Sequence, residues 1–367
     1  MTSKSSTKIA ESKVSFFRSD LKDKHAPTID IIPRKHMVAL NEGCQDPYQL
    51  IQKDFLNRLD SLSLNRYISP TSDLLHQKLA DYAGVPKEQL LFGNGADDML
   101  YHLFLAVREN AQSFALSLAP SYFDYATMCG AVDLGIRFLD MRSDFSFDVE
   151  RYIELAQDPN CRLAILCNPN NPTGNLLPKD QIRQILTALP DKLVVIDEAY
   201  YEFSGFSFVS ELDKYPNLIL IRSFSKGFSA AGLRFGYAIS SSQNIAELWK
   251  TQITFHTSVL VKAFALSILE NKELFLEHVQ QIIVLRDKLY RDLKELPQLI
   301  VHPSATNFLT FSLAGKSDDL YNDLQEHDIA VRNVGSHPAL QNCLRVSISC
   351  EEAVNAFRDQ VKAYLVK

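Results

Sequence analysis

The sequence predicts an α/β fold: a mostly parallel central sheet covered by helices, followed by a smaller α+β domain. Strand-like apolar runs alternate with helix-like segments from about Gln49 to about Phe255, which is the pattern of parallel βαβ units. Residues 257–294 are rich in helix formers and predict a long pair of helices. Short apolar runs then predict the strands of the smaller domain, at 307–311, 329–331 and 344–348.

Length and composition exclude several classes of protein. A chain of 367 residues, 46% of them hydrophobic, can form one large and one smaller domain with a sizeable core. A net charge of −6 disfavours a nucleic-acid surface. Because no apolar run approaches the length of a membrane span, we expect neither nucleic acid nor membrane as a partner. Residues 1–12 lack the apolar core of a secretory signal, so a cytoplasmic protein with a frayed tail is expected.

Cysteine and histidine spacing gives no sign of a metal. The six cysteines include no Cys-x-x-Cys pair, and the nine histidines form no His-Glu-x-x-His. We therefore expect neither a metal site nor a disulfide framework.

The first polar segment of interest follows the apolar run 217–221. It places Lys226 at the carboxyl end of a predicted strand, where open α/β sheets bind ligands. A desolvated amine there would be nucleophilic towards a carbonyl. Ser223, Ser225 and Arg234 add hydroxyl donors and a guanidinium suited to a phosphate. A solvated lysine in a surface loop is the plainer alternative.

The second segment is the strand 193–196, which ends in Asp197, with Glu198 beside it and Tyr200 three residues on. A carboxylate such as Asp197 could pair with a protonated ring nitrogen and hold it protonated. The Tyr200 hydroxyl could reach a ring oxygen. A helix cap or an ordinary loop residue would also explain an acid at this place.

The third segment, residues 168–174, reads Asn-Pro-Asn-Asn-Pro-Thr-Gly after the apolar strand 163–166. Prolines and asparagines at this density predict a rigid turn, which could aim the Asn171 amide at a ligand. An ordinary turn between a strand and a helix explains the prolines and the glycine, but not the whole string.

Together the three segments resemble the cofactor site of fold-type I aminotransferases that use pyridoxal phosphate. The string at 168–174 is similar to that of the histidinol-phosphate aminotransferase family, and the resemblance covers nearly the whole chain. It implies that Lys226 holds the cofactor covalently and moves protons during the reaction. It also implies that Asp197 pairs with the ring nitrogen, and that Asn171 and Tyr200 contact the ring oxygen.

The same resemblance supplies the remaining cofactor residues. Tyr122 matches an aromatic residue that stacks on the ring, and the backbone of Ala96 and Asp97 matches a phosphate loop at a helix start. Tyr67 matches a tyrosine that reaches the cofactor phosphate of the neighbouring subunit, which implies a homodimer with shared active sites. In isolation, each of these tyrosines is also compatible with a packing residue, and residues 93–98 lack the third glycine of a dinucleotide fingerprint.

The implied substrates are an amino donor and a 2-oxo acid, namely histidinol phosphate and 2-oxoglutarate, as in histidine biosynthesis. Arg345 and Arg332 match arginines that bind the anionic end of the substrate, and Asn41 begins a loop over the active site. This loop departs from the family after Glu42. An aminotransferase for aromatic or other amino acids therefore stays open, as does an enzyme similar to threonine-phosphate decarboxylase. A non-catalytic regulator is disfavoured, because the lysine and the aspartate are both present.

The family's domain plan implies four segments: residues 1–47 as an arm joining the small domain, 48–256 as the large domain, 257–297 as interdomain helices and 298–367 as the small domain. The cofactor would then lie between the two domains and against the partner subunit.

Overall fold

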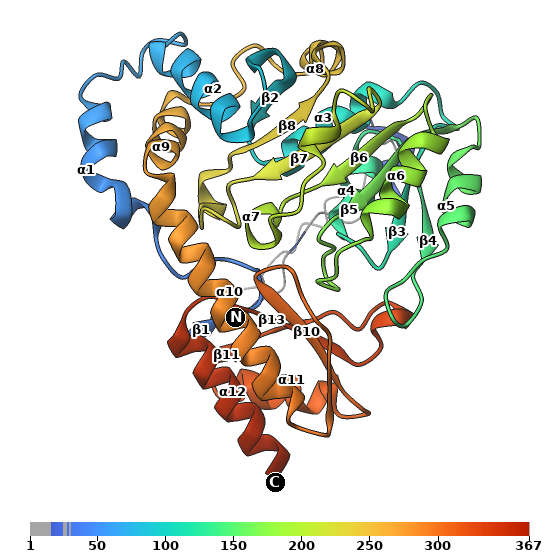
Figure 1. Ribbon diagram of the computed structural model, residues 1–367, viewed down its shortest axis with the longest axis vertical. Helices are drawn as coiled ribbons and strands as arrows, with labels where there is room; N and C mark the ends of the chain where they lie inside the picture. The colour runs from blue at the N-terminus through green and yellow to red at the C-terminus, as the bar shows by residue number, and fades with distance from the viewer. Residues whose placement is uncertain (1–15, 25–27, 29–30, 367) are drawn as a thin grey trace, which may run out of the picture. The chain divides into compact units, whose positions relative to one another are not determined.

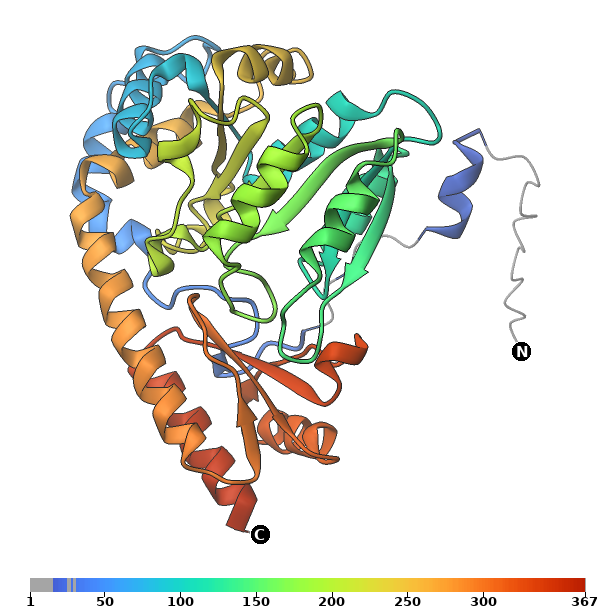
Figure 2. The ribbon, with the colours of Figure 1, turned by 45° about the vertical axis from the view of Figure 1, so that its right-hand side comes forward.

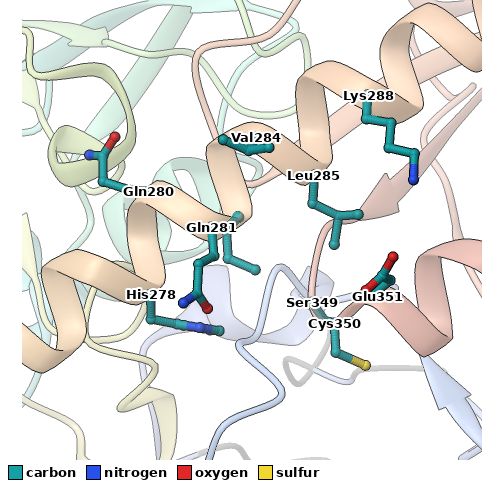
Figure 3. A pocket seen from close by; sticks show the side chains of 10 residues that line it. His278, Gln280, Gln281, Val284, Leu285, Lys288, Ser349, Cys350 and Glu351 are labelled. Atoms are coloured by element: carbon teal, nitrogen blue, oxygen red, sulfur yellow. The ribbon is translucent and has the colours of Figure 1, made fainter.

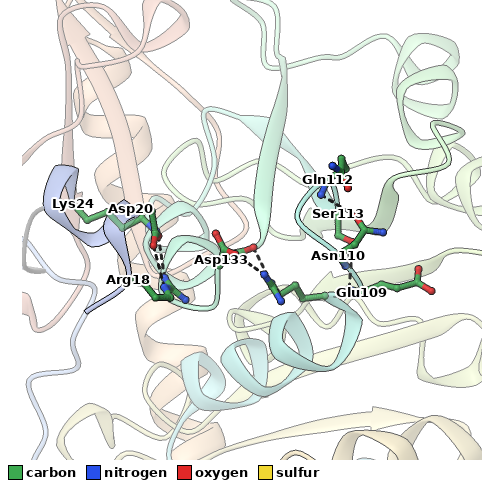
Figure 4. A network of polar contacts seen from close by, with 9 residues as sticks. Arg18, Asp20, Lys24, Glu109, Asn110, Gln112, Ser113 and Asp133 are labelled. Atoms are coloured by element: carbon green, nitrogen blue, oxygen red, sulfur yellow. Dashed lines mark hydrogen bonds and ion pairs between the residues drawn. The ribbon is translucent and has the colours of Figure 1, made fainter. Parts of the chain in front are cut away.

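The computed structural model describes residues 16–24, 28 and 31–366, so the expected frayed tail lies outside the described residues. The chain divides into two compact units, residues 1–31 and 32–367. In the first, a short 3-10 helix spans Ser19–Asp23, and Asp20 forms ion pairs with Arg18 and Lys24 (Figure 4). All elements described below belong to the second unit.

The central sheet has seven strands in the order β2-β8-β7-β6-β5-β3-β4 (Figure 1). Strand β8 runs antiparallel to both of its neighbours, and the remaining pairs are parallel. The mostly parallel sheet predicted from the alternating pattern is therefore confirmed. The strands are β2 (Leu90–Gly93), β3 (Phe114–Ala119), β4 (Gly135–Asp140), β5 (Cys161–Cys167), β6 (Leu193–Asp197), β7 (Leu218–Ser223) and β8 (Gly236–Ser240).

Helices cover both faces of this sheet because successive strand residues point to opposite sides. Ile165 and Val195 pack with helices on one face, whereas Leu166 and Ile196 pack on the other. The first face is covered by α3 (Ala96–Val107), α4 (Asp124–Ala131) and α8 (Ser242–Trp249). The second is covered by α2 (Pro70–Ala83), α5 (Val149–Ala156), α6 (Lys179–Ala188) and α9 (Val259–Glu270).

Turn chemistry fixes where several of these elements begin. The Ser258 hydroxyl accepts a hydrogen bond from the Val261 amide and caps α9, as serine commonly does at a helix start. Between α3 and β3, the Ser113 hydroxyl accepts from the amides of Glu109 and Asn110 (Figure 4). These bonds let the chain leave a helix and enter the sheet within a few residues.

A second sheet, β12-β13-β10-β9, forms the core of the smaller domain. The long helix α10 runs from the end of α9 alongside this sheet, next to α12 (Figures 1 and 2). Near the N-terminus, β1 pairs in parallel with β11. The elements are β1 (His36–Met37), α1 (Pro47–Leu59), α7 (Tyr201–Ser204), α10 (Lys272–Lys294), β9 (Leu299–Val301), β10 (Phe308–Leu313), α11 (Ser317–Glu326), β11 (Ile329–Ala330), β12 (Arg332–Asn333), β13 (Cys343–Ser347) and α12 (Glu351–Val366). Within the described residues, we find no helix with the length and apolar character needed to cross a bilayer.

Candidate active site

Three neighbouring strands bring the three polar segments together. Strand β5 pairs with β6 so that Cys167 lies opposite Asp197, and β6 pairs with β7 so that Asp197 lies opposite Ile221. The loops that follow these strands therefore start side by side at one edge of the sheet. Those loops carry Asn171 and Lys226, while Asp197 ends its own strand.

Lys226 is a partly buried amine whose environment disfavours its charge. Its Nζ donates a hydrogen bond to the carbonyl oxygen of Leu40 at 3.1 Å. Burial, followed by the positive charge of Arg345, lowers the pKa of Lys226 from 10.5 to about 8. With a pKa of about 8, about a tenth of the amine is unprotonated at neutral pH, and this is the nucleophilic form.

Asp197 is a buried carboxylate with defined partners, and only 3% of the residue is exposed. The Tyr125 hydroxyl donates to its Oδ2 at 2.7 Å and the Ala199 amide donates to its Oδ1 at 3.1 Å. Burial raises the pKa of Asp197 to about 6, and these two hydrogen bonds act in the opposite direction. A cation placed against this carboxylate would be strongly favoured, because little water is present to screen it.

Sequence reasoning missed Tyr125. Tyr122 lies two residues before α4 and Tyr125 lies in its first turn, so their spacing of three residues was the available signal. The two rings pack edge to face, with centroids 5.4 Å apart. Tyr122 points to the same region, where its hydroxyl donates to Asp97 Oδ1 at 3.2 Å.

The start of α3 forms a cradle for an anion. Gly95 precedes the helix with φ of +101°, and a Cβ there would lie 2.7 Å from Arg234 Nη2. A Cβ at Gly236 would lie 2.3 Å from the Ala96 nitrogen. These two glycines therefore let the guanidinium and strand β8 approach the first turn of the helix, whose backbone N–H groups are free to bind an anion.

Further phosphate-type donors surround this cradle. Arg234 Nη2 pairs with Asp97 Oδ2 at 2.8 Å, and both side chains are partly open to solvent. Ser223 and Ser225 are buried on the neighbouring segment, and the Ser223 hydroxyl accepts from the Ser225 amide at 3.0 Å. The charges of Asp97 and Arg234 both act on the pKa of Lys226, so the amine lies near the cradle.

The smaller domain delivers Arg345 to the same place. Its Nη1 donates to Asn171 Oδ1 at 2.6 Å, and its Nη2 donates to the carbonyl oxygen of Ala39 at 2.7 Å. Asn41 Nδ2 donates to the Tyr200 hydroxyl at 2.9 Å. Segment 39–41 therefore lies between strand β13 and the loops of the large domain.

Arg332 is the direct cross-strand neighbour of Arg345, on β12 and β13. Burial and the charge of Arg332 lower the pKa of Arg345 to about 10. The Arg345 Nε is buried and has no hydrogen-bond partner among the described residues. The two arginines are thus cross-strand neighbours, and the charge of Arg332 also acts on the Asp124 carboxyl, where it opposes the rise in pKa caused by burial.

Tyr67 is an exposed residue. Its ring stacks on Phe255 with centroids 4.1 Å apart, and 73% of the residue is exposed. The structure therefore brings together the other residues singled out in the sequence and leaves Tyr67 at the surface of one chain.

Glu198, the second acid at the end of β6, is engaged elsewhere. Its Oε2 accepts from Arg222 Nε at 2.9 Å, and both side chains are almost completely buried. The Phe208 amide donates to its Oε1 at 2.9 Å, and the Ser207 hydroxyl donates to its Oε2 at 3.0 Å. Glu198 is thus held in a buried ion pair that is separate from the contacts of Asp197 with Tyr125 and Ala199. The described residues hold no group of three or more histidine, cysteine or acidic side chains suited to a metal.

Comparison with known proteins agrees with this geometry. The family model described as aminotransferase class I and II matches residues 37–357. The histidinol-phosphate aminotransferase of Vesicomyosocius okutanii is 32% identical over 96% of this chain and 98% of its own length. Among solved structures, the Sinorhizobium meliloti histidinol-phosphate aminotransferase in complex with pyridoxal 5'-phosphate superposes with a TM-score of 0.83 at 22% identity, covering 96% of this chain and 99% of that one. The L-threonine-O-3-phosphate decarboxylase of Porphyromonas gingivalis gives 0.75 at 23% identity, covering 90% and 99%.

Proposed function

Because the chain belongs to the class I and II aminotransferase family and is therefore a pyridoxal-phosphate-dependent aminotransferase of fold type I, we propose that its amino donor is histidinol phosphate. The acceptor would be 2-oxoglutarate, and the products imidazole acetol phosphate and glutamate, a step of histidine biosynthesis. The name of the Vesicomyosocius okutanii relative supports this choice. Cytoplasmic residence remains our expectation.

The residues present suit the cofactor. We propose that the first turn of α3, with the backbone of Ala96 and Asp97, holds the phosphate together with Arg234, Ser223 and Ser225. The glycine-lined cradle next to a guanidinium supports this placement, since any side chain at Gly95 would fill it.

When bound, pyridoxal phosphate acts as an electron sink for the bonds at the substrate's α-carbon. In our proposal Lys226 forms the covalent link, and its Nζ then accepts and returns the proton that leaves the α-carbon. A pKa near 8 suits this task, because a base is most effective when its pKa is close to the working pH. Asp197 holds a proton on the ring nitrogen, Asn171 and Tyr200 contact the ring oxygen, and Tyr122 stacks on the ring.

The pair of arginines Arg332 and Arg345 supports histidinol phosphate as the substrate. Like charges directly opposite each other on adjacent strands destabilise a sheet, and Arg332 and Arg345 have this arrangement. A dianionic phosphate between them would offset both the repulsion and the burial of Arg345, whose buried Nε is a donor without a partner among the described residues. A monoanionic carboxylate would gain less from two guanidinium groups. Asn41 would contact the substrate from the loop above.

The test compares two amino donors in one variant. Charge-assisted pairs are worth roughly 1.5–3 kcal/mol, so Arg332→Ala should lower kcat/KM for histidinol phosphate by about 10–100-fold. The value for phenylalanine should change little. Arg291→Ala, which removes an exposed arginine of α10, serves as the matched control and should leave both values unchanged.

An aminotransferase for aromatic or other amino acids is the second candidate, and the loop after Asn41 favours it. Here the chain reads Glu42-Gly43-Cys44, and a Cβ at Gly43 would lie 2.0 Å from Ser229 Oγ. The loop is therefore packed tightly against the lysine segment, and its altered sequence could change which donor fits. A wild-type preference for phenylalanine or tyrosine over histidinol phosphate would overturn the first proposal. Release of carbon dioxide from threonine phosphate would point to the decarboxylase.

We also propose a homodimer in which Tyr67 serves the cofactor phosphate of the partner. Leu64, Ile68 and Ile253 are exposed large apolar residues, and they surround the stacked pair of Tyr67 and Phe255 in sequence. An apolar surface of this kind marks an interaction site on a protein, and a second copy of the chain would cover it.

The four-segment domain plan is proposed in the same way. Pairing of β1 with β11 supports an N-terminal arm that joins the small domain at 298–367. The helices α9 and α10 support the interdomain segment 257–297, which leaves 48–256 as the large domain.

A further inference from the structure

Two cysteines meet beside the loop that covers the lysine. Cys44 follows segment 39–43, and Cys350 lies between β13 and α12. The Cys44 Sγ donates a hydrogen bond to the carbonyl oxygen of Ser349 at 3.1 Å. Cys350 directly follows Ser349, and both cysteines line one hollow, so the two thiols lie close together although they are separated by most of the chain.

The pair is reachable from outside. Cys44 is exposed and Cys350 is half-buried, whereas the other four cysteines are buried. Cys350 lines a hollow between α10 and the start of α12 together with His278 and Glu351 (Figure 3). It also lines a second hollow with Cys44 and Glu42.

We propose that Cys44 and Cys350 form a dithiol site that low-molecular-weight disulfides, such as oxidised glutathione, convert into an intramolecular disulfide. In the first step one cysteine sulfur attacks the glutathione disulfide, whose S–S bond breaks. One glutathione thiol leaves with the proton of the cysteine. In the second step the other cysteine attacks the mixed disulfide and releases the second glutathione. Two protein thiols are thus oxidised, and one glutathione disulfide is reduced to two thiols.

For the second step the two sulfur atoms must approach to an S–S bond length of about 2.05 Å. Cys44 is exposed, so its side chain has room to move towards Cys350. Partial burial and the neighbouring thiol raise the pKa of Cys44 to about 11. Because the thiolate is the attacking form, exchange should start slowly at neutral pH and is best followed in mildly alkaline buffer.

The bond would fix the active-site loop. Gly43 packs against Ser229, Asn41 donates to Tyr200, and Leu40 accepts from Lys226. A disulfide at Cys44 would tie this loop to the start of α12, on the side of the smaller domain. This inference does not depend on which amino donor the enzyme uses.

The experiment treats the full-length holoenzyme with oxidised glutathione and then counts free thiols after unfolding. The count should fall from six to four, because two of the six cysteines are consumed. Peptide mapping should find Cys44 joined to Cys350 with the loss of two hydrogens and no retained glutathione. A dithiol reductant should restore all six thiols.

Two single variants separate this chemistry from unspecific oxidation. In Cys350→Ser the glutathione adduct should accumulate on Cys44, because no second thiol can displace it. In Cys44→Ser any adduct should stay on Cys350. The cofactor's absorbance confirms that each protein remains folded. A wild-type protein that keeps six free thiols, or that retains glutathione on Cys44 beside a free Cys350, would overturn the proposal.

Discussion

Replacing Lys226 by methionine should stabilise the cofactor-free protein in a pH-dependent way. In the folded chain, burial and Arg345 lower the pKa of Lys226 from 10.5 to about 8. At about 1.4 kcal/mol for each pKa unit, the full difference corresponds to about 3 kcal/mol of unfavourable free energy when the amine is charged. Because Lys226 is only partly buried, solvent reduces the effect, and we expect about 2 kcal/mol.

The sign follows from proton linkage. Between about pH 8 and pH 10.5 the unfolded chain binds more protons at this lysine than the folded chain does, so stability rises with pH. The destabilisation by the charged Lys226 is fully present below about pH 8 and disappears as the pH approaches 10.5. Wild type should therefore gain about 2 kcal/mol relative to Lys226→Met across this window.

Urea denaturation of the two cofactor-free proteins at constant ionic strength measures the difference. Loss of the hydrogen bond from Lys226 to Leu40 shifts the unfolding free energy of the variant by a constant amount. The pH-dependent part of the difference between the two proteins is therefore unaffected by it. Lys250→Met is the control, because that side chain is 68% exposed and its removal should leave the wild-type pH profile unchanged. If wild type and Lys226→Met keep a constant difference from about pH 7 to 10.5, the amine is not desolvated and the argument for a poised lysine fails.

Three further changes test other parts of the site. Asp197→Asn should lower turnover by orders of magnitude and retain the fold. In wild type, cofactor binding should weaken below about pH 6, because the Asp197 carboxyl is then protonated. A variant with near-normal turnover would show that another acid pairs with the ring nitrogen. Mixing inactive Tyr67→Ala with inactive Lys226→Ala should restore activity through heterodimers with one intact site each, and a fully active monomer in sedimentation would refute the shared site. Arg222→Met leaves the buried Glu198 without its ion-pair partner and should lower the free energy of unfolding by about 3–5 kcal/mol. Adding Glu198→Gln should recover much of this loss. A double variant no more stable than the single one would show that the pair is not coupled.

Much of the fold follows from local sequence patterns. Apolar runs of strand length ending in polar residues located β5, β6 and β7, because a buried parallel strand must be apolar along its length and its polar side chains can begin only where it ends. Two of those ends placed Asp197 and Lys226 at one edge of the sheet. Composition predicted the helices α9 and α10. It did not predict the boundary between them, which lies at Asn271.

The sequence by itself determined which residue types stand at the ends of neighbouring strands, and only the tertiary structure decided what each of them contacts. Tyr125 and Asp197 are 72 residues apart, and Lys226 and Leu40 are 186 apart. No local pattern encodes such pairs, because they depend on strand order and on which segments of the chain meet at the ends of the strands. The same is true of Arg332 beside Arg345, which is a consequence of register between two strands, and of the contact between Cys44 and Ser349, which brings Cys44 close to Cys350. Burial, which lowers the pKa of the lysine and raises that of the aspartate, likewise arises only when the chain is folded.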